Sequence, residues 1–99
     1  MKNHQLKLLS PMNENNEIAV KTLKAMGYEI KNIRLAMAKL IGLTHADLGQ
    51  MVGLKQVTVS QVLAGFRRTP EVQEAIANAL GIRKGIFFEN EDRDNQHSN

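Results

Sequence analysis

The sequence predicts an all-α fold, a compact bundle of about five short helices with an extra helix near the N-terminus. Three observations support this prediction. Apolar residues recur at helical spacing in several separate segments, and glycines follow those segments where a helix would end. No stretch alternates apolar and polar residues as a half-buried strand does. The 99 residues are enough for a single domain.

We expect three regions along the chain. Residues 1–27 form an N-terminal arm and the extra helix, residues 28–88 form the main helical domain, and residues 89–99 form a disordered acidic tail. The extra helix, at about 14–26, has acidic residues at its start, lysines near its end and Gly27 behind it, with Ala19, Leu23 and Met26 on one face. Its role is either docking or dimerisation, or covering the domain.

The first helix of the main domain is expected at about 29–41, ending before Gly42. Its apolar residues fall at helical spacing, so its role is to form the core. They are Ile30, Ile33, Met37, Leu40 and Ile41.

Residues 43–65 predict two short helices, at about 45–52 and about 56–64, joined by a tight turn. Thr44 is suited to cap the first helix, and Asp47 follows three residues later as in a capping box. Gly53 supplies the left-handed residue that ends this helix, and Gly49 allows the second helix to approach closely. The two helices should therefore cross tightly. Their apolar residues are Leu48, Val52, Leu54, Val59 and Val62.

Two more helices are expected after this pair. Thr69 as N-cap, Pro70 in the first turn and Glu71 behind it start a helix that runs to Leu80 and ends before Gly81. A short final helix, at about 83–88, would bring Ile86 and one or both of Phe87 and Phe88 to the core or to a partner.

The central pair of helices resembles the helix-turn-helix of the lambda-repressor-like DNA-binding domains, the Cro and repressor type. The features that carry the resemblance are Thr44, Leu48-Gly49, Val52-Gly53-Leu54, and Val59 with Val62. About eight constrained positions agree in register, which makes the match more specific than a lone glycine turn. More loosely, the resemblance covers residues 30–88, and it implies a double-stranded DNA operator as the partner.

The resemblance implies that the helix at about 56–64 lies in the major groove of DNA. If Val59, Val62, Leu63 and Phe66 point inward, the opposite face of the helix is presented to the groove. Gln56, Val57 and Gln61 occupy the positions that contact bases in the family. A glutamine can pair with adenine through two hydrogen bonds, and a valine can pack on a thymine methyl group.

Other residues near this helix are expected to contact the DNA backbone. Lys55 precedes the helix and cannot accept the hydrogen bonds that a serine or threonine cap would accept, but it could bind a phosphate. His45 stands where the family commonly has a phosphate-binding glutamine. The full expected set of backbone contacts is His45, Lys55, Thr58, Ser60, Arg67 and Arg68.

The charge distribution fits a polyanionic partner. The net charge is only +3, but residues 30–70 carry six lysines and arginines against Asp47 alone. The segment from Glu89 onward instead carries four carboxylates, at Glu89, Glu91, Asp92 and Asp94, against Arg93. Charge by itself more often marks an ordinary solvated surface.

Several classes of function have no support in the sequence. There is no cysteine, the three histidines are scattered, and no glycine-rich phosphate loop or metal-ligand spacing occurs, so we expect no enzyme, metal site, cofactor or small-molecule ligand. No apolar run is long enough to cross a membrane, and the N-terminus lacks a signal-peptide pattern. We therefore expect a cytoplasmic protein.

The sequence thus predicts a sequence-specific transcriptional regulator, a repressor of phage-type genes, that acts as a homodimer on two half-sites about 34 Å apart. Two alternatives remain open. One is an antitoxin-type autoregulator that also binds a toxin protein. The other is a helix-turn-helix used as a scaffold for protein binding, against which the polar glutamines and arginines argue.

Overall fold

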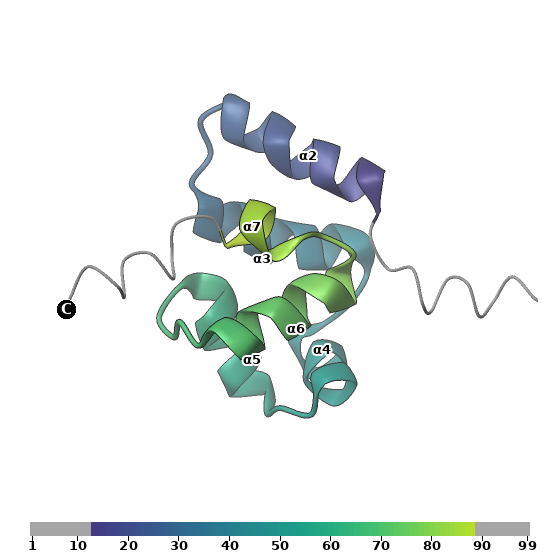
Figure 1. The fold of residues 1–99 in the computed structure, drawn as a ribbon, viewed down its shortest axis with the longest axis vertical. Coiled ribbons are helices and arrows are strands. Elements are labelled where there is room, and N and C mark those ends of the chain that lie inside the picture. Colours follow the sequence, from purple (N-terminus) through teal and green to yellow (C-terminus); the bar gives the residue numbers. More distant parts are fainter. Residues whose placement is uncertain (1–12, 89–99) are drawn as a thin grey trace, which may run out of the picture.

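The computed structural model describes residues 13–88, which form six α-helices (Figure 1). In chain order these are α2 (Glu14–Ala25), α3 (Ile30–Ile41), α4 (His45–Val52), α5 (Gln56–Ala64), α6 (Pro70–Leu80) and α7 (Lys84–Phe87). No residue in this part of the chain lies in a strand. The predicted all-α class is confirmed. The expected arm in residues 1–12 and the expected tail in residues 89–99 lie outside the described residues.

The predicted helix boundaries agree with the structure to within one residue. α4 and α5 begin and end where the sequence places them, because the capping box before α4 and the glycine between the helices are local signals. α2 ends one residue early, so Met26 becomes its C-cap, and α3 begins one residue late, at Ile30. α6 starts at Pro70 as predicted, but its N-cap Thr69 makes no side-chain capping bond.

The α4–α5 pair lies at one end of the molecule and α2 at the other, at the bottom and top of Figure 1. α3 contacts α2 on one side and α5 on the other, and α6 contacts α4, α5 and α7. The α4–α5 pair therefore packs against α3 and α6. Its outer side faces away from the rest of the domain.

All six helices contribute to one hydrophobic core, together with residues of the turns that join them. Its most deeply buried side chains come from α2, α4, α5, α6 and the segment after α6, and both aromatic residues of the last turn, Phe87 and Phe88, are buried in it. The two rings meet edge to face with their centroids 5.4 Å apart. The other buried apolar residues are Val20, Ile33, Met37, Ala38, Leu48, Val59, Val62, Leu63, Ile76, Ala77, Leu80 and Ile82.

Phe66 and Leu40, which were expected to face the core, are exposed instead, and so is Met26, which was placed on one helix face with Ala19 and Leu23. Phe66 is 83% exposed because Gly65, with φ of 89°, ends α5 before it, so the helical spacing no longer applies. Leu40 is 73% exposed because it lies outside the buried side of α3, which consists of Ile33, Arg34, Met37 and Ala38. Met26 is exposed because it follows the last residue of α2.

Arg34 was counted among the basic residues of segment 30–70, but it lies inside the protein. Its side chain is buried, with 1% of the residue exposed, and it does not belong to a basic surface. The Nε group donates to the Leu63 carbonyl at 2.6 Å and the Nη1 group donates to the Phe87 carbonyl at 3.1 Å. The guanidinium also lies 4.9 Å from the centroid of the Phe88 ring. Arg34 therefore joins α3 to the ends of α5 and α7.

Helix α2 covers the domain, which is one of the two roles expected for it. Val20 on its inner face is fully buried. At its start, the Asn13 backbone amide donates to the Gly81 carbonyl at 2.7 Å and the Asn16 side chain donates to the Leu80 carbonyl at 3.2 Å. Near its end, the Lys24 Nζ group donates to the Ile86 carbonyl at 3.1 Å. These contacts attach α2 to the end of α6, to the segment that connects α6 with α7, and to α7 itself.

Glu17 and Arg83 form the ion pair that joins the middle of α2 to the same segment. Arg83 donates from its backbone amide to Glu17 Oε2 at 2.9 Å and from its Nη2 group to Oε1 at 2.9 Å. The Arg83 side-chain bonds, followed by the backbone bond, hold the pKa of Glu17 below its ordinary value of 4.5. The ionised form of the Glu17 carboxylate is thus more stable in the folded protein than in the unfolded chain.

This pair predicts a pH-dependent contribution to stability. Because the folded-state pKa of Glu17 is lowered, its stabilising effect is fully present above the unfolded-state value near 4.5 and is lost as the pH falls through the folded-state value. We expect Glu17→Gln to lower the thermal unfolding midpoint at pH 7 and to have a much smaller effect at pH 3. Glu14→Gln, on the same helix but exposed, is the control. Equal losses for Glu17→Gln at both pH values would contradict the assignment.

Candidate nucleic-acid interface

The candidate interface is built on the start of α4, which is fixed by a complete capping box. The Asp47 backbone amide donates to Thr44 Oγ1 at 2.9 Å, and the Thr44 backbone amide donates to Asp47 Oδ2 at 2.9 Å. The backbone bond from Thr44, followed by its hydroxyl bond, lowers the pKa of Asp47 below 3.8. This reciprocal pair, predicted from the sequence, sets where α4 begins and so where His45 lies.

The turn between α4 and α5 depends on two glycines with different roles. Gly53 adopts φ of 76°, a left-handed conformation that L-residues with a side chain rarely adopt. Gly49 allows a close approach, because a Cβ atom placed on it would lie 2.5 Å from the Leu54 carbonyl oxygen. The Leu54 backbone amide closes the turn by donating to the Gly49 carbonyl at 2.8 Å. The expected tight crossing is therefore present.

This close approach predicts that Gly49→Ala is destabilising even though alanine is the better helix former. The added methyl group would meet backbone, which cannot move aside as a flexible side chain can, so we expect a loss of about 1–3 kcal/mol in the free energy of unfolding. Gly85→Ala is the matched control, because a Cβ atom there meets nothing within 4 Å. Urea unfolding measures both. A Gly49→Ala protein as stable as the parent would refute the packing argument.

Helix α5 presents two different faces. Val59, Val62 and Leu63 are fully buried against the core, as the sequence predicted. On the other side, Gln56 is exposed, Val57 is 57% exposed and Gln61 is half-buried. Val57 and Gln61 therefore share the outer side of the helix, and Gln56 is exposed at its first residue. An exposed valine beside two amides is an arrangement that can pack on a methyl group while the amides form hydrogen bonds.

His45 and Ser60, predicted separately as DNA-backbone contacts, are bonded to each other. His45 Nδ1 lies 2.6 Å from Ser60 Oγ, and the Ser60 hydroxyl donates to the Gln56 carbonyl at 3.1 Å. Because the Ser60 hydroxyl hydrogen points to the Gln56 carbonyl, the Ser60 oxygen accepts from the Nδ1–H of His45. The other ring nitrogen, Nε2, is left for another partner. A phosphate bound at Nε2 would then need the protonated ring. The pair also fixes α4 against the first turn of α5.

The predicted cationic contacts lie at the two ends of α5. Lys55 is exposed at the N-terminal end and, as expected, makes no side-chain capping bond. Arg67 and Arg68 are exposed in the loop after the C-terminal end, where the Arg68 Nε group donates to the Gly65 carbonyl at 3.4 Å. Thr58 is half-buried between these ends. Positive charge therefore flanks the outer side of α5 at both ends.

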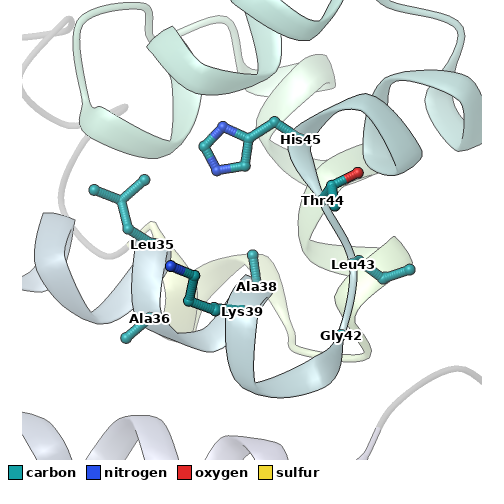
Figure 2. Close-up of a pocket in the computed structure, with 8 residues that line it drawn as sticks. All are labelled: Leu35, Ala36, Ala38, Lys39, Gly42, Leu43, Thr44 and His45. Atoms are coloured by element: carbon teal, nitrogen blue, oxygen red, sulfur yellow. The ribbon is translucent and has the colours of Figure 1, made fainter.

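An open groove of about 680 Å³ runs between α3 and the start of α4. Figure 2 shows His45 on one side of this groove and Leu35 and Lys39 on the other. Lys39 was expected only as part of the general basic charge, because the helix that carries it was interpreted as core. The structure places it on the same groove as His45, so it is a further cation beside the α4–α5 pair. No sequence signal distinguished it from Lys31 on the same helix.

No protein-family model matches the chain, and neither a curated protein nor a solved structure is significantly similar to it. Within residues 13–88, no three histidine, aspartate or glutamate side chains are grouped so that they could hold a metal ion. None of the helices described here is both long and apolar enough to span a bilayer.

Proposed function

We propose that this protein is a sequence-specific double-stranded DNA-binding transcriptional regulator, a repressor of phage-type genes, that inserts α5 into the major groove. The observation that carries the proposal is the division of α5 into a buried valine face and an outer face with Val57 and Gln61, with Gln56 exposed at the first residue of the helix. A major groove about 12 Å wide admits one helix, and residues at the start of that helix reach base edges. Gln56 is the first residue of α5.

Base recognition would come from the amide groups and the valine on this face. Each glutamine can donate to and accept from an adenine in the major groove, and Val57 can pack on a thymine methyl group. A good pair of hydrogen bonds gives about 1–3 kcal/mol of discrimination against the wrong base. The rigidity of the helix pair supports this role, because Gly49 and the His45–Ser60 bond hold α5 in one position against α4.

Affinity would come from cations around α5. Lys55, Arg67 and Arg68 lie at the two ends of the helix, and Lys39 lies on the groove beside His45. Contacts of this kind position a protein on the duplex without reading its sequence. We further propose that two copies act together on half-sites about 34 Å apart, and that occupying a promoter in this way represses transcription.

A second candidate function is protein binding, either as a scaffold or as an antitoxin-type regulator that also holds a toxin. Two observations favour it. Val57 and Phe66, near the two ends of α5, are exposed apolar side chains, and the groove along α3 contains the apolar residues Leu35, Ala36 and Leu43. A protein partner would bury these side chains, whereas DNA bound at α5 would leave most of them exposed.

A salt titration with DNA separates the two candidates. The full chain is titrated into a labelled 30-base-pair duplex of random sequence, and binding is followed by gel shift or fluorescence anisotropy from about 50 to 200 mM salt. The DNA-binding proposal predicts that the logarithm of the binding constant falls linearly with the logarithm of the salt concentration. The expected slope is about −3, for three or four phosphate contacts per copy. Absence of binding at the lowest salt would reject DNA as the partner.

A further inference from the structure

We propose that the groove between α3 and the start of α4 binds an amphipathic anion, a carboxylate on an unbranched apolar tail such as a medium-chain fatty acid. The site is defined by the groove alone, and only its regulatory consequence rests on the proposed function. The proposal departs from the expectation, based on sequence motifs, that the chain has no small-molecule ligand. No motif could predict this site, because its side chains come from two helices that only the fold brings together.

The head-group end of the site is formed by two nitrogen-bearing side chains, those of Lys39 and His45. Figure 2 shows the Lys39 amino group and the His45 ring on facing sides of the groove. Nδ1 of His45 lies 2.6 Å from Ser60 Oγ, which fixes the ring, and Nε2 is the ring nitrogen that faces Lys39 in the figure. A carboxylate placed between them would accept from the Lys39 ammonium group and from the protonated ring at Nε2.

The rest of the groove suits an apolar tail. Its apolar lining residues are Leu35, Ala36, Ala38 and Leu43. The two alanines leave open the space that larger side chains would fill, and Leu35 is still 37% exposed beside them. The volume of about 680 Å³ lies within the range of about 300–1,000 Å³ that is typical of small-molecule sites. Such sites are lined mainly by apolar side chains with a few polar groups that fix the ligand, as this groove is.

The charges of the groove favour an anion over a second copy of this chain. Of the described residues that line it, none carries a carboxylate. Helix α3 has exposed lysines at positions 31 and 39 and no acidic residue, so two α3 helices packed on each other would bring like charges together. The ligand that satisfies both parts of the groove therefore has one negative group and an apolar body.

The consequence for the proposed function is competition with DNA. The cations assigned to the DNA backbone include Lys39 and His45, and a bound carboxylate would occupy both of them. A ligand that binds only the DNA-free protein weakens DNA binding by mass action. The groove would thus be an effector site, at which an apolar carboxylate releases the regulator from DNA.

The binding test is an NMR titration of the full chain with sodium decanoate below its micelle concentration. We expect signals of the Leu35 and Leu43 methyl groups and of the His45 ring to shift together. The expected Kd is about 0.1–1 mM, which suits a ligand of about twelve non-hydrogen atoms in an open groove. Decanol, with the same tail and no charge, should bind at least about threefold more weakly, and acetate should shift no methyl signal. Shifts centred on the exposed Phe66 and Leu40 would instead mean adsorption to apolar side chains and would overturn the site.

Three variants test the two parts of the groove. Lys39→Met keeps the aliphatic stem but removes the ammonium group, and should weaken decanoate binding about three- to tenfold. Lys31→Met, exposed on the same helix, should change it by less than about twofold. Ala36→Leu fills the groove from an exposed helical position and should weaken binding at least about tenfold.

Two results with these variants would overturn the proposal. One is equal losses for Lys39→Met and Lys31→Met, which would mean that general charge attracts the ligand. The other is unchanged decanoate binding by Ala36→Leu. A shift of ligand-free Ala36→Leu from dimer to monomer in sedimentation would also overturn it, because the groove would then be an interface between copies.

A DNA readout separates the site from the proposed function. About 1 mM decanoate should weaken binding of the parent to a random duplex about two- to tenfold, and binding of Ala36→Leu by less than about 1.5-fold. If the groove signals shift but no DNA is bound, the site stands and the proposed function fails. If DNA is bound and the groove signals do not move, the site is wrong and the proposed function is unaffected. Equal DNA affinity of the parent with and without bound decanoate would overturn the competition.

Discussion

Replacing Arg34 by methionine is expected to lower the free energy of unfolding by about 2–5 kcal/mol, the largest stability change predicted for this domain. The substitution keeps much of the side-chain volume but removes the donors to the Leu63 and Phe87 carbonyl groups. Each buried carbonyl left without its donor costs about 1–3 kcal/mol. The ends of α5 and α7 would then lose their common attachment to α3.

Two companion variants make the Arg34 result interpretable. Lys31→Met, on the same helix but exposed, should change the free energy of unfolding by less than about 0.5 kcal/mol. Arg34→Lys keeps the positive charge but lacks the planar fork that reaches two acceptors, so it should fall between the parent and Arg34→Met. Urea unfolding followed by circular dichroism gives all three values. A stability of Arg34→Met within 0.5 kcal/mol of the parent would refute the role assigned to Arg34.

Arg34 also marks the limit of what the sequence could predict. From the sequence alone, Arg34 is expected on the basic surface. Its burial depends on two carbonyl groups, at Leu63 and Phe87, that only the folded chain brings together. Charge counted along the sequence therefore overstated the basic surface between residues 30 and 70. The long-range geometry, not the composition, decides which cations can face a partner.

Local signals predicted the candidate interface much better. The Thr44–Asp47 capping box and the left-handed Gly53 involve neighbours in the sequence, so the limits of α4 and α5 were predicted correctly. The orientation of α5 followed from its buried valines. Phe66 was predicted wrongly because the helical spacing was continued past Gly65. The bond between His45 and Ser60 could not be predicted, since it depends on the crossing of the two helices.

The largest expected effect on binding belongs to Arg67 and Arg68, in the loop between α5 and α6. We expect Arg67→Ala/Arg68→Ala to weaken binding to every DNA sequence by about 10- to 100-fold at 100 mM salt, with similar factors for random and preferred duplexes. The salt slope should become shallower by about 1 to 2, because each lost phosphate contact releases about one counterion fewer. Fluorescence anisotropy at several salt concentrations gives both values.

The control for this double variant removes the same charge elsewhere. Lys21→Ala/Lys31→Ala takes two exposed lysines from α2 and α3, outside the loop that carries Arg67 and Arg68. It should reduce affinity only slightly and leave the slope within about 0.5 of the parent value. Equal losses for the two double variants would mean that net charge alone, and not the position of Arg67 and Arg68 beside α5, determines binding.

The central claim is that the outer face of α5 reads DNA sequence, and selection from a library of random duplexes tests it most directly. The parent protein should enrich two related half-sites with centres about 10 base pairs apart. Gln56→Ala/Gln61→Ala should lose the preference at defined positions within each half-site while keeping salt-dependent binding to random DNA. Enrichment of no sequence by the parent, or of the same sequence by both proteins, would contradict the claim.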